Sequence, residues 1–240
     1  MKNLLVKLSI IFSLIFCTSI NGVDALNNEE IKDSSKEKKI IYLTFDDGPS
    51  VVTNDVLDIL KENNVKATFF LIGNQIKGKE DIVKRIQNEG HGIGLHTYTH
   101  KFKKIYASND AFINEMLQCQ DEVYRVTGER PKIIRFPGGS VKRLTKEFKS
   151  RLDEKGFKVY DWNIDSGDGI RPKTPPDKLL KQATHGNVKS GPIILLMHCD
   201  CMQKNSCKAL PSVIKFYKDK GYEFKVIVDK TPECYFPIRR

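Results

Sequence analysis

Two histidines four residues apart, His96 and His100, have the residue type and spacing of metal ligands. On a helical turn this spacing places both imidazoles on one face, where they can hold a single metal ion. The pair alone is a weak signal, because histidines at this spacing also arise by chance. The 240-residue chain has only five histidines, however, and a third, His198, directly follows an apolar segment.

Two adjacent acids, Asp46 and Asp47, stand at the end of another apolar segment. Crowded carboxylates repel each other unless a cation neutralises them. With a cation present, one carboxylate can ligate while its neighbour acts as a general base. An Asp-Gly turn with a helix cap is the alternative interpretation. Together with the histidine pair, the acids favour a metal site made by Asp47, His96 and His100.

Such a site of two histidines and one carboxylate leaves positions open for water and substrate. Zn²⁺ in it lowers the pKa of a bound water from about 15.7 towards 7 and polarises a carbonyl group. Fe²⁺ held by the same ligands serves oxygenases. The three ligands therefore leave hydrolytic and oxidative chemistry open.

Strand-like and helix-like segments alternate along the chain and predict how these residues are positioned. We expect strands at residues 40–45, 67–72, 92–95, 133–136, 157–164, 193–197 and 222–228. We expect helices at residues 53–63, 80–89, 110–126, 145–155, 176–185 and 207–220. Short joints between these units predict a parallel α/β sheet, either open and doubly wound or closed into a barrel. Because most candidate residues directly follow a strand, we favour a distorted or incomplete (β/α) barrel.

The N-terminal segment differs from the rest of the chain. Residues 1–25 begin with lysines, continue through a short apolar run and end with small residues, as a secretory signal peptide does. An uncleaved N-terminal anchor is the alternative. Residues 26–38 are almost entirely polar and indicate a flexible linker. Residues 39–240 are expected to form a single domain of a secreted, extracellular or wall-associated protein.

Charge and cysteines limit the partners. The formal net charge is +10 and falls to +9 without residues 1–25, which contain two lysines and one aspartate. Such an excess favours an anionic cell-wall polymer, although plain solubility also explains it. We expect that the protein binds no nucleic acid, that it contacts a membrane only through an uncleaved anchor, and that it is a monomer.

The five cysteines after residue 25 predict one or two disulfides and at least one unpaired thiol; they are Cys119, Cys199, Cys201, Cys207 and Cys234.

Five short segments, taken together, resemble the polysaccharide deacetylase family, the NodB-homology domain of carbohydrate esterase family four. They occur in the family's order at residues 44–48 (TFDDG), 96–100 (HTYTH), 135–140 (RFPGGS), 161–168 (DWNIDSGD) and 194–198 (ILLMH). The resemblance covers about residues 40–228. The chain departs from the family pattern at three places: at Lys101, at Gly169, where an aromatic residue is common, and directly after His198. These departures affect the expected substrate groove rather than the expected reaction.

The resemblance implies a role for each residue. Asp46 would be the base, Arg135 would orient its carboxylate, and Asp47, His96 and His100 would hold a divalent ion. Zinc is the first expectation, with cobalt, manganese and nickel as alternatives. His198 would be the acid and would need an acidic partner, for which Asp165 is the first choice and Asp168 the second. Aromatic rings often stack on sugars, so Tyr98, Phe136 and Trp162 are predicted substrate contacts, with ordinary packing favoured for Phe136 and for Tyr42. Gly138, in the third segment, is a further predicted substrate contact.

The resulting functional prediction is a metal-dependent hydrolase that removes N-acetyl groups from an amino-sugar polymer. A water activated by the metal would attack the acetamide carbonyl, with Asp46 as base and His198 as acid. Export and positive charge favour peptidoglycan over a chitin-like glycan. An O-acetyl esterase and an inactive wall-binding module are alternatives, and a non-haem iron oxygenase would not need Arg135 and His198 together.

Overall fold

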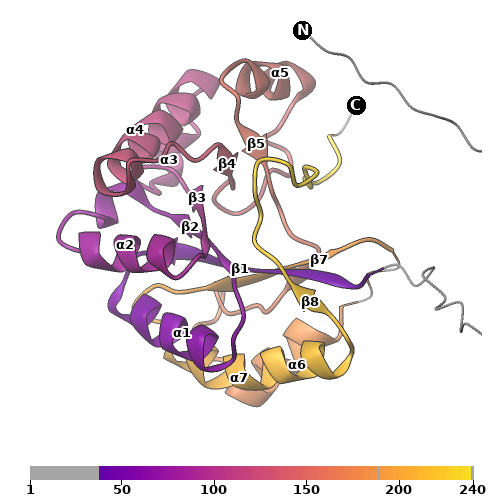
Figure 1. The fold of residues 1–240 in the computed structure, drawn as a ribbon. Coiled ribbons are helices and arrows are strands. Elements are labelled where there is room, and N and C mark those ends of the chain that lie inside the picture. Colours follow the sequence, from indigo (N-terminus) through magenta and orange to yellow (C-terminus); the bar gives the residue numbers. More distant parts are fainter. Residues whose placement is uncertain (1–37, 187, 189, 239–240) are drawn as a thin grey trace, which may run out of the picture. The chain divides into compact units, whose positions relative to one another are not determined.

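The computed structural model describes residues 38–186, 188 and 190–238 (Figure 1). The predicted signal peptide and all of the predicted linker except Lys38 lie outside these residues. The described residues form one compact unit.

In the part of the chain that the structure describes, eight parallel strands form one sheet. Seven of them follow the order β5-β4-β3-β2-β1-β7-β6, and the eighth, β8, pairs with the first residues of β1. The strands are β1 (Ile40–Gly48), β2 (Thr68–Leu71), β3 (Gly92–Leu95), β4 (Ile133–Ile134), β5 (Lys158–Val159), β6 (Ile164–Asp165), β7 (Ile193–His198) and β8 (Glu223–Phe224). Helices lie around the outside of the sheet (Figure 1). The prediction of a distorted, incomplete (β/α) barrel is confirmed.

The helices follow the strands as a parallel sheet requires. They are α1 (Val51–Glu62), α2 (Glu80–Asn88), α3 (Phe102–Ile105), α4 (Asn109–Thr127), α5 (Lys146–Glu154), α6 (Pro176–Thr184) and α7 (Lys204–Asp219), with a 3₁₀ turn η1 (Gly73–Gln75). The long helix α4 begins at the capping side chain of Ser108 and ends at Gly128, whose left-handed backbone suits glycine. The short elements α3 and η1 were not predicted from sequence. Within the described residues, no helix has the length and apolar character needed to cross a membrane.

The central strand β1 determines which polar side chains meet. Apolar residues of β1 and β7 are buried, and the two strands pair in parallel over six residues. This register makes Asp46 and His198 direct neighbours at the carboxyl ends of the strands. The hydrophobic pairing of the two strands thus brings two predicted site residues, which are far apart in sequence, side by side.

The predicted strand at residues 157–164 is wrong as a single element. Its first part, β5, pairs with β4, whereas β6 pairs with β7 on the other side of the sheet. Between them Asn163 joins the chain to the start of β7. Its side chain donates to the carbonyl of Pro192 and accepts from the N–H of Ile194, and its own N–H donates to the carbonyl of Ile194. The open side of the barrel lies at this crossing.

The C-terminal segment, yellow in Figure 1, runs beside this open side. Cys234 forms an isolated parallel bridge with Tyr160, and its carbonyl accepts the N–H of Asp161 at 2.6 Å. All five cysteines in the described residues are free thiols, so the expectation of disulfides is wrong for this structure. Two of them, Cys119 and Cys199, are fully buried in the core.

Candidate metal centre and active site

A cavity of about 320 Å³ opens at the carboxyl ends of the central strands. Its lining combines the two acids of β1, both histidines of the 96–100 segment and His198 from β7. The structure therefore brings together residues from three separate sequence segments, as the barrel prediction required.

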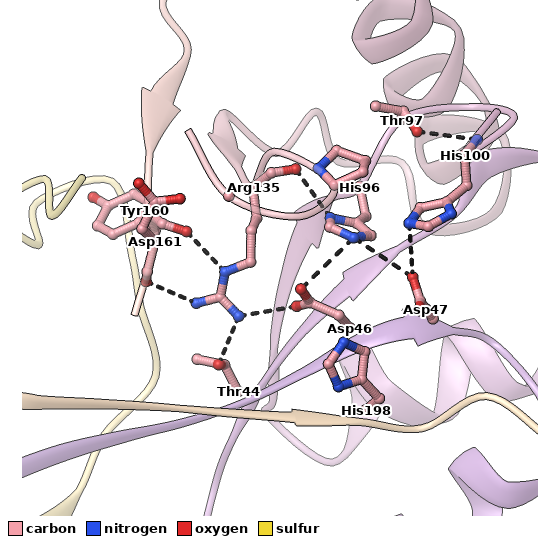
Figure 2. A network of polar contacts seen from close by, with 12 residues as sticks. Thr44, Asp46, Asp47, His96, Thr97, His100, Arg135, Tyr160, Asp161 and His198 are labelled. Carbon is pink, nitrogen blue, oxygen red and sulfur yellow. Dashed lines mark hydrogen bonds and ion pairs between the residues drawn. The ribbon is translucent and has the colours of Figure 1, made fainter. Parts of the chain in front are cut away.

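Asp47, His96 and His100 form the candidate metal centre (Figure 2). One ligand atom from each lies within 4.8 Å of the others, and Asp47 Oδ1 is 3.5 Å from His96 Nε2 and 3.3 Å from His100 Nε2. Asp47 Oδ1 is buried without a hydrogen-bond partner among the described residues. Because a buried anionic oxygen is costly to leave unpaired, this arrangement fits a cation between the three side chains.

His96 has the orientation expected of a metal ligand. Its Nδ1 lies 3.0 Å from the carbonyl oxygen of Arg135, which can only accept, so Nδ1 carries the proton and Nε2 faces the candidate centre with its lone pair. Burial, opposed by the nearby carboxylates, lowers the pKa of His96 below its ordinary value. The neutral ring is the form that binds metals.

The two histidines converge from a loop rather than from a helical turn, so the expected helical geometry is wrong. The backbone is left-handed at Asp47 (φ 67°), Thr97 (φ 70°) and His100 (φ 54°), a conformation that is uncommon for residues other than glycine. Two of the three candidate ligands therefore have strained backbones, a feature that often accompanies functional sites.

Asp46, the predicted base, is 2 % exposed and lies beside the candidate metal centre. Its Oδ2 is 3.6 Å from His96 Nε2, while its Oδ1 accepts a hydrogen bond of 2.9 Å from Arg135 Nη1. The same Nη1 also donates to Thr44 Oγ1 at 2.7 Å (Figure 2). Arg135 thus contacts the carboxylate directly, which is the position that the resemblance implied.

The Arg135 side chain is completely buried, and each of its three guanidinium nitrogens donates at least one hydrogen bond. Nε donates to the carbonyl of Tyr160 at 2.8 Å and Nη2 to that of Asp161 at 3.1 Å. The guanidinium carbon lies 4.1 Å from the centroid of the Phe70 ring, a favourable cation–π distance. These contacts leave the guanidinium little freedom, so the Asp46 carboxylate is held in one orientation.

Asp161 links this arrangement to the C-terminal segment. Its buried carboxylate accepts hydrogen bonds from the backbone and hydroxyl of Ser140 and from the N–H of Phe236. Burial outweighs these donors and raises the pKa of Asp161. Sequence reasoning assigned it no role, although it opens one of the family-like segments.

His198, the predicted acid, is paired with a buried carboxylate. Asp168 Oδ1 lies 2.7 Å from His198 Nδ1, and Asp168 Oδ2 accepts from the His198 N–H at 3.0 Å and from Ser206 Oγ at 2.7 Å. Burial opposes protonation of the ring, but the hydrogen bond and charge of Asp168 outweigh it and raise the pKa of His198 to about 9. The ring is therefore protonated at neutral pH.

The preference for Asp165 as the partner of His198 was wrong. Asp165 ends strand β6 and lines the cavity, but its Oδ1 accepts the N–H of Gly167 at 2.7 Å, as in an Asx turn. The turn carries the chain on to Asp168, the second choice, which reaches the ring. Sequence spacing identified the segment but could not show where this turn directs each carboxylate.

The predicted sugar contacts divide into two groups. Gly138 and Trp162 line the cavity, whereas Phe136 is fully buried and stacks on Phe112 at 4.2 Å, so it belongs to the core. Tyr98 packs against the core, and Tyr42 is buried as expected. Four further cavity residues were not predicted as contacts: Phe102, Gly169, Ile170 and Leu196.

Gly169 lies against the ring of His198, the predicted acid. A Cβ atom at this position would be 2.3 Å from His198 Cε1, far inside contact distance. The departure from the family pattern at this position thus has a structural counterpart, because only glycine allows the backbone to approach the ring so closely.

Comparisons with known proteins agree with this geometry. The family model described as polysaccharide deacetylase matches residues 33–159. A peptidoglycan-N-acetylglucosamine deacetylase from Bacillus cereus is 40 % identical over 208 residues, covering 85 % of this chain and 74 % of that protein. The peptidoglycan-N-acetylmuramic acid deacetylase PdaA from Bacillus subtilis is 32 % identical over 199 residues, covering 80 % of this chain and 72 % of that protein.

Solved structures show the same similarity. A crystal structure of a Bacillus cereus polysaccharide deacetylase superposes with a TM-score of 0.75 at 38 % identity, covering 84 % of this chain and 96 % of that one. The catalytic domain of a peptidoglycan N-acetylglucosamine deacetylase from Eubacterium rectale gives a TM-score of 0.76 at 29 % identity, with 85 % and 95 % covered. The resemblance drawn from the five segments is confirmed: this chain belongs to the polysaccharide deacetylase family of enzymes.

Proposed function

We propose that this protein is a metal-dependent hydrolase that removes acetyl groups from N-acetylglucosamine units of peptidoglycan. One observation carries the proposal: a buried carboxylate, Asp46, and a protonated imidazole, His198, line one cavity beside a cluster of three candidate metal ligands. Amide hydrolysis needs a base, an acid and charge stabilisation, and these groups can supply all three. Relatives that bear the name of peptidoglycan-N-acetylglucosamine deacetylase support this substrate.

Asp46 is the proposed general base. Arg135 holds one oxygen of its carboxylate, leaving the other directed toward the candidate metal ligands. There it can accept a proton from the attacking water. A divalent ion bound by Asp47, His96 and His100 would lower the pKa of that water and polarise the acetyl carbonyl.

His198 is the proposed general acid. Because Asp168 occupies Nδ1, the proton on Nε2 remains available for the leaving amine of the sugar. Expulsion of the amine needs this proton, since an unprotonated amine is a poor leaving group. Trp162 and Ile170 at the cavity wall would contact the pyranose ring.

Zinc is the proposed metal, because two imidazoles and one carboxylate with open positions form a common catalytic zinc site. Cobalt, manganese and nickel suit the same ligands and remain alternatives. We also propose that the protein acts outside the cell, either secreted or held by its N-terminal segment, as a monomer. The net charge of +10 would favour contact with anionic wall polymers.

Acetate release tests the function. The metal-loaded protein is incubated with peptidoglycan, with N-acetylglucosamine oligomers and with an O-acetylated glycan, and acetate is measured over time. We expect release from the N-acetylated substrates, with peptidoglycan preferred. Asp46→Asn should abolish release while metal stays bound, whereas His96→Ala should weaken metal binding itself. Release only from the O-acetylated glycan, or an undiminished rate in Asp46→Asn, would overturn the proposal.

A further inference from the structure

The loop between the two histidines is held by a carboxylate from outside the cavity. Glu115, on α4, accepts the N–H of Tyr98 at 3.0 Å and that of Thr99 at 2.7 Å with one oxygen. The Thr99 hydroxyl lies 3.0 Å from both carboxylate oxygens. The Glu115 side chain is 3 % exposed, so these contacts are shielded from water.

The opposite side of the loop is held as well. The carbonyls of Thr97 and Tyr98 accept hydrogen bonds from Gly73 N at 3.0 Å and Asn74 N at 2.9 Å, both in η1. Glu115 thus takes the N–H groups of the same loop whose carbonyls are bound by η1. Hydrogen bonds from α4 and from η1 thus hold the loop that joins His96 to His100.

These hydrogen bonds matter because the backbone of the loop is strained. Thr97 and His100 both have left-handed backbones, which are strained in residues other than glycine and persist only where surrounding contacts enforce them. The two N–H groups that Glu115 binds lie between these strained positions. Without that carboxylate, two shielded N–H groups would lose their partner and the loop could relax.

The negative charge of Glu115 is compensated locally. Lys104 Nζ lies 2.9 Å from Glu115 Oε1, and the Lys104 side chain is 56 % exposed. Burial disfavours the charged carboxylate, but Lys104 and the Thr99 donors outweigh burial and lower the pKa of Glu115. The carboxylate is therefore available as an acceptor at neutral pH.

From these contacts we infer that Glu115 is a positioning residue for the metal centre, holding the 97–99 loop so that His96 and His100 converge on one ion. This inference rests on the proposed metal-dependent function. Glu115 does not line the cavity, and its hydrogen bonds to the loop go to the N–H groups of Tyr98 and Thr99 and to the Thr99 hydroxyl. Its effect would act through the backbone to which both histidines belong.

Cobalt titration of the protein, followed by visible absorbance, tests the inference without relying on turnover. Glu115→Gln keeps the size of the side chain but offers one acceptor oxygen instead of two and removes the charge. We expect this variant to bind Co²⁺ about 10- to 100-fold more weakly, the range seen when supporting contacts of metal ligands are lost. The Co²⁺ spectrum should also change, because the ligand geometry changes.

Glu122→Gln on the same helix is the matched control, since Glu122 pairs with Arg125 on the outer surface. It should bind Co²⁺ with the affinity of the parent. Lys104→Met tests the compensating charge and should give a smaller loss than Glu115→Gln, because the carboxylate remains. Thermal unfolding of each metal-free variant verifies that the protein is folded during the titration.

The outcomes separate the two proposals. If the parent binds Co²⁺ and Glu115→Gln is folded and binds it with equal affinity and spectrum, the role of Glu115 is refuted while the proposed function stands. If the parent and all variants fail to bind Co²⁺ and to release acetate, the proposed function itself fails. A weaker, spectrally altered complex in Glu115→Gln, with parent-like binding in Glu122→Gln, supports the inference.

Discussion

Replacing Asp168 with asparagine should move the alkaline limit of activity to lower pH. In the parent protein, Asp168 raises the pKa of His198 to about 9, so the acid stays protonated up to that pH. Asparagine can still accept a hydrogen bond from Nδ1 but carries no charge. The remaining influences are burial, which lowers the pKa, and the more distant carboxylates of Asp46 and Asp47, which raise it.

The size of the effect follows from the fraction of protonated His198. At pH 7.5 a ring with a pKa near 9 is almost fully protonated, whereas a ring near the ordinary value of about 6.5 is only about one-tenth protonated. We therefore expect kcat/KM of Asp168→Asn to fall at least about tenfold at pH 7.5 and to recover in part towards pH 5.5.

The assay is the pH profile of kcat/KM for acetate release, with metal occupancy measured at every pH. The ratio of variant to parent removes effects of pH on metal binding that both share. Asp165→Asn is the comparison variant, because Asp165 accepts a hydrogen bond from a backbone N–H and not from the His198 ring. This variant should move the alkaline limb of the profile much less. An Asp168→Asn profile with the alkaline limb of the parent would refute the assignment of His198 as the acid tuned by Asp168.

Three further changes test other parts of the structure. Gly169→Ala should lower kcat/KM about 100-fold with Co²⁺ affinity unchanged, because the added Cβ must displace His198; equal turnover would contradict this steric argument. Arg135→Met should lower the free energy of unfolding in urea by about 3–5 kcal/mol, since it leaves Asp46 buried without its partner. Burial lowers the pKa of His91 to about 4, so His91 by itself should contribute a loss of about 1–2 kcal/mol of stability between pH 7 and pH 5, as the unfolded chain takes up the proton. His91→Gln should lose less over this range in the same urea assay.

The sequence was sufficient to predict the barrel and the residues that converge in it. Apolar strands recur with helical crossovers between them, and a polar residue follows nearly every strand, so the carboxyl-end site was predictable from Asp46, His96 and His198. These predictions depend on periodicity and chain order, which a sequence displays directly.

The remaining features depend on how loops turn. A side-chain turn at Asp165 decides that Asp168 reaches His198, and nothing in the spacing of two acids three residues apart reveals this. The support from Glu115 was also missed, because an acid within an amphipathic helix has the pattern of an ordinary surface residue. The buried stack that contains Phe136 could not be distinguished from a sugar platform, since both are aromatic.

The C-terminal segment, which contains none of the family motifs, contacts residues beside the proposed catalytic site. Phe236 binds the carboxylate of Asp161 through its N–H and packs edge-on against Trp162, with ring centroids 5.3 Å apart. A shortened homologue that stopped after β8 would still contain every catalytic residue named above. It would nevertheless lack the N–H that binds Asp161 and the ring that packs against Trp162. A genome survey based on motifs alone would still count it as an active enzyme.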